Sequence, residues 1–171
     1  MVKKVGAGMS NSLLETKILE ALQSVKDPEI STVSIIELGM LEKIEIDLPK
    51  LTVYLLPTFL GCPALEIIKA NVCKAFENFK DLTEVNVEFL LSPPWTSDRI
   101  TENGRKQLLE FGIAPPPQFI TETGEWQVDC PYCGSIYTTL ENLFGPTACR
   151  SILYCRSCKN PFEAMKPMAN L

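Results

Sequence analysis

Two CxxC pairs near the C-terminal end constrain this chain more than any other feature. Cys130 and Cys133 form the first pair, and Cys155 and Cys158 form the second, with 21 residues between the pairs. Each CxxC turn brings two sulfurs to one metal ion, and two turns complete a tetrahedral four-sulfur site with Zn–S distances of roughly 2.3 Å. The spacing predicts a zinc-ribbon-like domain over residues 126–171, with zinc as its metal.

The segment around these cysteines has few other means of folding. About 45 residues with scattered apolar groups bury little surface, so metal binding must provide the folding energy. Gly134 supplies the positive φ that a CxxC turn often needs. A disulfide or a dithiol redox pair is the alternative, but a thioredoxin-like motif needs a βαβ context, for which the segment is too short. Cys149 is either a buried filler thiol or an alternative ligand that would turn the site toward an iron–sulfur cluster.

The composition excludes several classes of function. The 171 residues include no histidine, so imidazole catalysis and histidine metal ligands are excluded. The net charge of -5 argues against a nucleic-acid partner. No run of 18 apolar residues occurs, and no apolar segment follows Lys3 and Lys4, so we expect neither a membrane span nor a signal peptide. We therefore expect a cytoplasmic protein whose seven cysteines are metal ligands or reactive thiols.

The first part of the chain alternates between helical and strand periodicity. Apolar spacing predicts a helix over about 12–25, and alternation predicts strands over 43–48, 51–56 and 85–91. A second helix is expected to begin at Pro63, because proline suits the first helical position. A β-helix-β crossover of this length makes the second and third strands parallel. The fold class is therefore α+β, with a small mixed sheet of about three strands.

The boundary between the two parts is marked by a proline run. A short helix is expected over 101–111, with Gly112 as its C-terminal cap, and the prolines that follow favour an extended linker. The prediction is a first domain over 12–114, a linker over 115–125 and the ribbon over 126–171.

Cys62 is a candidate reactive thiol. It directly precedes Pro63, so the positive end of a helix is expected to lower its pKa and favour reactivity or metal binding. The alternative is a packed cap residue. Asp27 and Glu29 bracket a proline in another loop, where they either serve ordinary turn chemistry or act as carboxylate ligands near Cys62.

Several short motifs together resemble a known family. They are Asp27-Pro28-Glu29-Ile30, Glu37-Leu38-Gly39-Met40, Pro57 to Pro63, Pro93 to Asp98, Gly104-Arg105 and Phe111 to Pro116 in the first part, and Cys130 to Gly134 with Phe144 to Cys149 in the second. The combination resembles PaaD, the phenylacetate-degradation accessory family, whose first domain is similar to the iron–sulfur carrier domain also found in SufT. The likeness runs from about Leu13 to Lys166.

The resemblance implies an accessory or assembly protein of the multicomponent phenylacetyl-CoA epoxidase, which helps to mature its iron or iron–sulfur centres. That oxygenase uses a di-iron site and a reductase with flavin and iron–sulfur centres, so its hydroxylating chemistry belongs to other subunits and no catalytic residue is expected here. The implied carrier site is Cys62 with Asp27 and Glu29, which would hold a transient cluster. The implied partners are the oxygenase and reductase subunits or iron–sulfur assembly proteins.

Two other functions fit the same residues. An electron-transfer component of the oxygenase would carry a redox-active centre. A structural zinc-ribbon adaptor would dock oxygenase subunits without needing Cys62.

Overall fold

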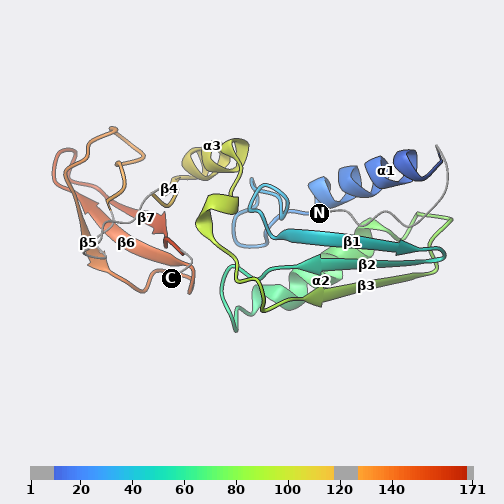
Figure 1. Cartoon of the computed structure of the whole chain (residues 1–171). Coiled ribbons are helices and arrows are strands. Elements are labelled where there is room, and N and C mark those ends of the chain that lie inside the picture. Colours follow the sequence, from blue (N-terminus) through green and yellow to red (C-terminus); the bar gives the residue numbers. More distant parts are fainter. Residues whose placement is uncertain (1–9, 118–126, 169–171) are drawn as a thin grey trace. The chain divides into compact units, whose positions relative to one another are not determined.

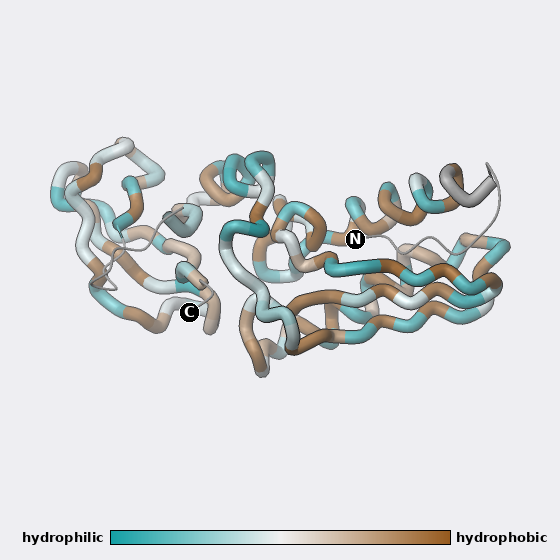
Figure 2. The backbone as a smooth tube through the Cα atoms, in the orientation of Figure 1, coloured by the Kyte–Doolittle hydropathy of each residue, from teal (hydrophilic) through white to brown (hydrophobic). Residues whose placement is uncertain are grey.

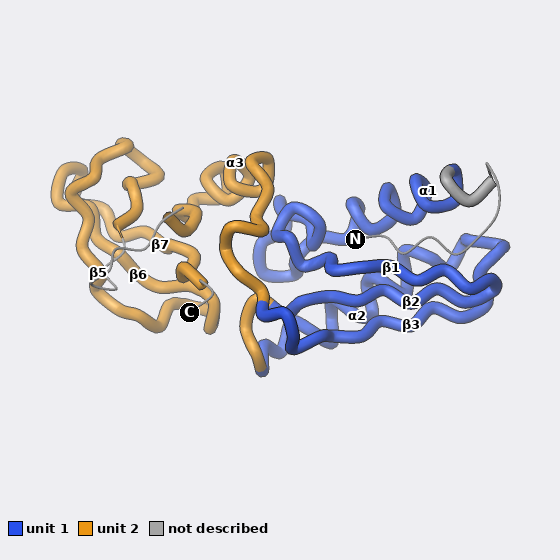
Figure 3. Tube along the Cα trace, in the orientation of Figure 1, with its two compact units in different colours: residues 1–57, 61–94 blue, residues 58–60, 95–171 orange. Residues whose placement is uncertain are grey.

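The structure is a computed structural model that describes residues 10–117 and 127–168 (Figure 1). The chain divides into two compact units (Figure 3). The first unit comprises residues 1–57 and 61–94, and the second comprises residues 58–60 and 95–171. No helix in the described parts of the chain is long and apolar enough to cross a membrane.

The first unit is built on a three-stranded mixed sheet. Its strands are β1 (Leu41–Asp47), β2 (Lys50–Leu55) and β3 (Glu84–Phe89), in the spatial order β1-β2-β3. β1 and β2 pair antiparallel, as a hairpin requires, whereas β2 and β3 pair parallel. The predicted fold class, the hairpin and the parallel crossover are all confirmed.

Two helices complete the first unit. They are α1 (Ser10–Ser24) and α2 (Ala64–Ala75), of which α2 packs against β3 and α1 packs against α2. The strands alternate apolar and polar residues, as the banding in Figure 2 shows, so one face of the sheet is buried. The fully or almost fully buried side chains of the helices and strands are Ile18, Leu22, Ile44, Leu51, Val53, Leu55, Ala64, Ile68, Val72 and Val87. An extensive apolar core therefore holds this unit together.

The second unit contains a short helix and a four-stranded sheet. The helix is α3 (Glu102–Phe111), and the strands are β4 (Ile113–Ala114), β5 (Thr138–Asn142), β6 (Arg150–Cys155) and β7 (Pro161–Met165). Their spatial order is β4-β7-β6-β5, with β4 parallel to β7 and the other pairs antiparallel. A 3₁₀ turn, η1 (Ser97–Arg99), precedes the helix.

The ends of α3 follow the expected cap chemistry. The Thr101 hydroxyl accepts a hydrogen bond from the Gly104 N–H at 3.0 Å, and Gly112 caps the C-terminal end with φ 89°. Gly112 thus serves as the predicted C-terminal cap, because glycine adopts positive φ without a Cβ penalty.

The residues after Gly112 pack inside the second unit. Ala114 is fully buried beside β7, and the Pro116 carbonyl accepts a hydrogen bond from Arg105 at 2.7 Å. The compact units therefore divide near residue 94, because strand pairing attaches the end of α3 to the ribbon sheet. The predicted boundaries, 12–114, 115–125 and 126–171, remain a prediction about which pieces fold alone, and residues 118–125 of that linker lie outside the described residues.

The core of the ribbon is thin. Its buried cluster is Ala114, Val128, Cys130, Leu153, Cys155, Phe162 and Ala164, with Cys158 packed against it. Three of these eight residues are cysteines of the two CxxC pairs. The ribbon's core and its metal centre are therefore largely the same place.

Candidate metal centre and carrier loop

The four ribbon cysteines lie close together. Their sulfur atoms all lie within 4.8 Å of one another. The Sγ atoms of Cys130 and Cys158 are 3.7 Å apart, and those of Cys133 and Cys155 are 3.6 Å apart. A tetrahedron with Zn–S bonds of roughly 2.3 Å has edges of about 3.8 Å, so this arrangement fits one four-coordinate ion. The domain thus has the ligand set of a metal-binding zinc ribbon.

Two similar turns present these sulfurs. Gly134 follows the first pair with φ 69°, and its N–H donates to the Cys130 carbonyl at 2.8 Å. Lys159 follows the second pair with φ 64°, and its N–H donates to the Cys155 carbonyl at 2.9 Å. The sequence pattern indicates Gly134 but not Lys159, because lysine rarely adopts positive φ. Lys159 directly follows its CxxC pair, as Gly134 does, and this shared position is the feature of the sequence that could have indicated its positive φ.

Without a cation, the four thiols do not all ionise near neutral pH. Hydrogen bonding from the Cys158 N–H is the main cause that lowers the pKa of Cys155 to about 6. The Ser135 N–H lowers the pKa of Cys133, but burial and hydrogen bonds with the neighbouring thiols together raise it to about 12. Burial raises the pKa of Cys130. A dication in the centre would reverse this repulsion and hold four thiolates.

Cys149 lies outside the four-sulfur cluster. It precedes β6, where its sulfur is 3.2 Å from the Thr147 hydroxyl oxygen and its carbonyl accepts from the Lys166 N–H at 2.9 Å. Its half-buried position corresponds to the filler-thiol alternative.

The carrier loops of the first unit do approach one another. Cys62 lies just before Pro63, which caps α2 with φ -65°, so α2 begins one residue later than predicted. The negative charges of Glu29 and Asp27 both act on the Cys62 thiol. The fold therefore brings Asp27 and Glu29 toward a cysteine that lies 35 and 33 positions away from them in the sequence.

The predicted low pKa of Cys62 is wrong. Burial is the largest cause that raises the pKa of this thiol, and the charges of Glu29 and Asp27 raise it further. The Ala64 N–H at the start of α2 lowers the pKa, as a helix end should, but not enough to compensate. The sequence reveals the helix start but not the approach of the two carboxylates that act against it.

Hydrogen bonds within its own loop shape the position of Asp27. Its Oδ1 accepts from the N–H of Glu29 at 2.8 Å and from the N–H of Ile30 at 2.9 Å. This is the ordinary turn chemistry of the alternative interpretation for Asp27. These bonds hold the Asp27 carboxylate against the backbone of its own loop.

A buried carboxylate outside the predicted site supports the same loop. Glu37 is almost fully buried, and its Oε2 accepts from both the N–H and the hydroxyl of Ser34 at 3.1 Å. The Lys26 ammonium lies 3.8 Å from the same oxygen. Glu37 begins the Glu-Leu-Gly-Met motif. A charged residue among apolar neighbours is the feature of the sequence that could have indicated this buried carboxylate.

The surroundings of Cys62 and the ribbon cysteines differ as candidate metal sites. Among residues 10–117 and 127–168, the ribbon cysteines are the one group of three or more ligand-type side chains gathered closely enough to hold an ion. Cys62, Asp27 and Glu29 share an electrostatic environment but do not form a closed ligand set.

Two family models match successive parts of the chain. Residues 15–89 match the model described as iron-sulfur cluster assembly protein, and residues 114–166 match the PaaD zinc beta ribbon domain. A solved structure from Bacillus anthracis, titled a domain of unknown function, DUF59, has 28% sequence identity and a TM-score of 0.54. That likeness covers 58% of this chain and 95% of the other chain.

Two curated proteins are similar in sequence to this chain. The "Fe-S protein maturation auxiliary factor YitW" of Bacillus subtilis (strain 168) is 34% identical over 89 residues, which is 52% of this chain and 86% of that protein. A protein of Escherichia coli (strain K12), named as one of the subunits of 1,2-phenylacetyl-CoA epoxidase, is 35% identical over 151 residues, which is 88% of this chain and 91% of that protein. Because this likeness spans both units and both family models, the chain belongs to the PaaD family.

Proposed function

We propose that this protein is an accessory factor of the multicomponent phenylacetyl-CoA epoxidase, which helps to load that oxygenase or its reductase with iron or an iron–sulfur cluster in phenylacetate degradation. Its relatives carry the names of an epoxidase subunit and of iron–sulfur maturation factors. Its partners are accordingly the oxygenase and reductase subunits or other iron–sulfur assembly proteins.

The observation that carries the proposal is the environment of Cys62. One thiol stands within the field of two carboxylates, Asp27 and Glu29, at the start of a helix. A soft sulfur ligand next to hard oxygen groups suits brief contact with iron. A site with so few ligands releases its cargo readily, unlike the closed four-sulfur ribbon.

The raised pKa of Cys62 fits a carrier. At neutral pH the free thiol keeps its proton, which protects it from oxidation because the thiolate is the reactive form. Iron that binds the sulfur displaces this proton, and the negative charges of Asp27 and Glu29 then favour the bound cation. Return of the proton helps the iron to leave toward an acceptor with more ligands.

For the ribbon we propose zinc with a structural role, held by Cys130, Cys133, Cys155 and Cys158. The mutual separation of the four sulfurs supports a single ion, because the sulfides of a polynuclear cluster would hold some of the thiolates farther apart. Zinc there would supply folding energy to a unit with a thin core. Metal and acid-labile sulfide analysis with absorption spectra on anaerobically purified protein tests this assignment; sulfide in the Cys62→Ser variant would contradict it.

The cellular role is tested on the oxygenase itself. The complex is purified from cells with and without this chain, and its iron content and activity are measured before and after addition of iron and reductant. We expect the polypeptides to be present but under-metallated without the chain. Cells that carry the Cys62→Ser variant should resemble the deletion, whereas the Cys73→Ser variant, altered in the last turn of α2, should resemble the wild type.

Two outcomes would redirect the assignment. Normal iron and activity in cells that lack the protein would defeat the assembly role. Full iron occupancy, with activity restored only when the protein is added back, would favour electron transfer or docking.

A further inference from the structure

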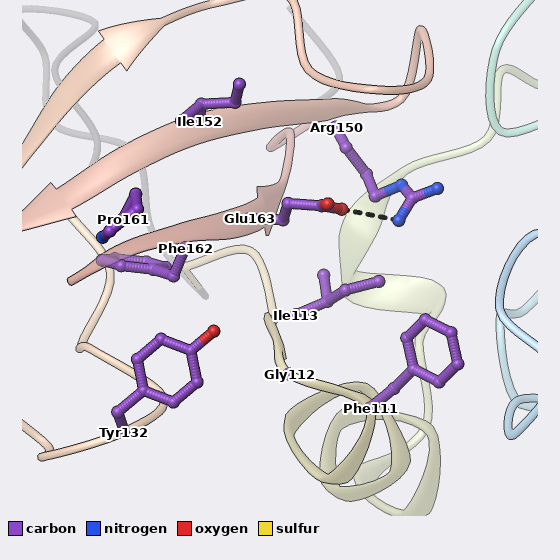
Figure 4. A pocket seen from close by; sticks show the side chains of 9 residues that line it. All are labelled: Phe111, Gly112, Ile113, Tyr132, Arg150, Ile152, Pro161, Phe162 and Glu163. Atoms are coloured by element: carbon purple, nitrogen blue, oxygen red, sulfur yellow. Dashed lines mark hydrogen bonds and ion pairs between the residues drawn. The ribbon is translucent and has the colours of Figure 1, made fainter.

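One face of the ribbon sheet carries a pocket of about 360 Å³ (Figure 4). All of its lining residues belong to the second unit. They are Phe111, Gly112, Ile113, Tyr132, Arg150, Ile152, Pro161, Phe162 and Glu163. Neither the four-sulfur centre nor the Cys62 loop contributes a ligand residue to it, so the pocket is a separate feature.

The pairing of the strands explains the floor of the pocket. Glu163 on β7 pairs with Ile113 on β4 and with Ile152 on β6, so these three side chains form one row across the sheet. Their strand neighbours Leu153 and Ala164 point to the opposite face, where they belong to the buried core. Phe162 is the one core residue that also lines the pocket, and the row of Ile113, Ile152 and Glu163 lies on the face opposite the ribbon core.

Aromatic rings form the walls. Tyr132 and Phe111 stand on either side of Ile113 in Figure 4, and they are 59% and 41% exposed. Tyr132 comes from the first CxxC turn, and Phe111 comes from the end of α3. Two exposed apolar rings beside an apolar floor favour a flat, apolar ligand group.

The Glu163 carboxylate is the polar group of the pocket that can accept a further hydrogen bond. Arg150 is only 7% exposed, and it donates to Glu163 Oε2 at 2.6 Å and to the Thr147 hydroxyl at 2.8 Å. Glu163 is about one-third exposed, and among the described residues no donor reaches its Oε1. The accessible polar edge of the pocket is thus a carboxylate that can accept one more hydrogen bond.

We propose that this pocket receives a tryptophan side chain of a partner polypeptide. An indole ring supplies a flat apolar surface for the Tyr132 and Phe111 walls, and its single N–H matches the acceptor capacity of Glu163. The exposed rim favours a polypeptide, because a side chain can enter while its flanking backbone lies across Tyr132 and Phe111. This inference goes beyond the proposed function and does not depend on the Cys62 site.

The test uses the full, metal-loaded chain and small probes. N-acetyl-L-tryptophan amide is titrated while the methyl NMR signals of Ile113 and Ile152 are followed, with the exposed Ile136 as a reference outside the pocket. We expect saturable shifts of the two pocket methyls with a dissociation constant on the order of 1 mM. The phenylalanine analogue, which lacks the ring N–H, should bind about fivefold more weakly.

Variants distinguish binding in the pocket from nonspecific binding of the probe to exposed aromatic side chains. Tyr132→Ala should weaken tryptophan-amide binding about tenfold, whereas Tyr137→Ala, which removes an exposed ring that does not line the pocket, should leave it unchanged. Glu163→Gln keeps the shape of the side chain but should reduce the preference for tryptophan over phenylalanine, because the indole N–H then meets a neutral amide.

Three results would overturn the inference. They are the absence of saturable shifts at Ile113 and Ile152, equal binding by the Tyr132→Ala and wild-type chains, and equal affinity for the tryptophan and phenylalanine probes. Free indole serves as the small-molecule arm. If it bound at least tenfold more tightly than the tryptophan amide, the pocket would be a small-molecule site and the polypeptide partner would be excluded.

Discussion

The two units of this protein use cysteine in opposite ways. In the first unit a broad apolar core holds the sheet and helices, and Cys62 lies at the edge of that core beside two carboxylates. In the second unit three of the four clustered cysteines are part of the core itself, and all four sulfurs lie within 4.8 Å of one another. A thiol can bind and release a metal where the fold does not depend on that metal. A thiol whose metal holds the fold together cannot.

This contrast predicts different responses to the loss of metal. The first unit should remain folded without any metal, because its buried side chains suffice. The second unit should not, because its core is small and the packed thiols repel one another when ionised. Each of the following tests measures one side of that comparison, from the largest expected effect to the smallest.

Removal of one ribbon ligand should have the largest effect. Structural zinc in small thiolate modules contributes about 10–16 kcal/mol, more than a ribbon of this size can replace by packing. We expect Cys133→Ala or Cys158→Ala to abolish amide protection in β5, β6 and β7 and to leave β1, β2 and β3 protected, as measured by hydrogen exchange. Cys149→Ala is the matched control and should change little. Full protection of the ribbon amides in a reduced, metal-free sample would contradict the prediction that the ribbon needs metal to fold.

A core substitution should have the converse effect. Leu55 on β2 is fully buried, so Leu55→Ala should destabilise the first unit by about 2–5 kcal/mol. Urea denaturation should show the first unit's transition at lower urea, with the zinc content unchanged. The control Leu48→Ala alters a side chain that is 53% exposed and should cost about 0.5 kcal/mol or less. A ribbon transition that moved together with the first unit would show that the two are one cooperative unit.

The position of α3 in the second unit can be tested at its cap. Thr101→Ala removes the hydroxyl that accepts from the Gly104 N–H and should cost about 1 kcal/mol. Because α3 clusters with the ribbon, we expect the metal-dependent transition to move. Thr83→Ala, at an exposed threonine of the first unit, is the control. Movement of the first unit's transition instead would support the predicted 12–114 domain.

The smallest effect concerns the acidity of Cys62. Burial and two carboxylates raise the pKa of this thiol, so its thiolate forms only at higher pH than in an ordinary cysteine. Alkylation of Cys62, followed by peptide mass spectrometry, should therefore accelerate through a midpoint above the free-cysteine value of roughly 8.5. Glu29→Gln should lower the midpoint, whereas Glu66→Gln, on the first turn of α2, should not. A midpoint below that of free cysteine would restore the helix-dominated prediction.

The elements predicted best from the sequence are those with strong local patterns. The hairpin, the parallel crossover and the Gly112 cap follow from alternation, loop length and residue type, which act over a few neighbouring positions. The ribbon ligands are equally predictable from the sequence, because CxxC spacing alone indicates which sulfurs can share one ion. The Lys159 turn escapes prediction because its conformation is dictated by the metal-binding turn and runs against the preference of the residue.

The sequence by itself determined the fold class, the four ribbon cysteines and the likeness to the PaaD family, since each depends on local spacing. Only the tertiary structure decided that α3 and β4 belong with the ribbon sheet, because strand pairing joins residues 113–114 to 163–164. It alone brought Asp27 and Glu29 to Cys62 and so reversed the expected shift of the thiol pKa. Electrostatic interaction depends on distance in space, and no local pattern encodes the approach of loops more than 30 residues apart.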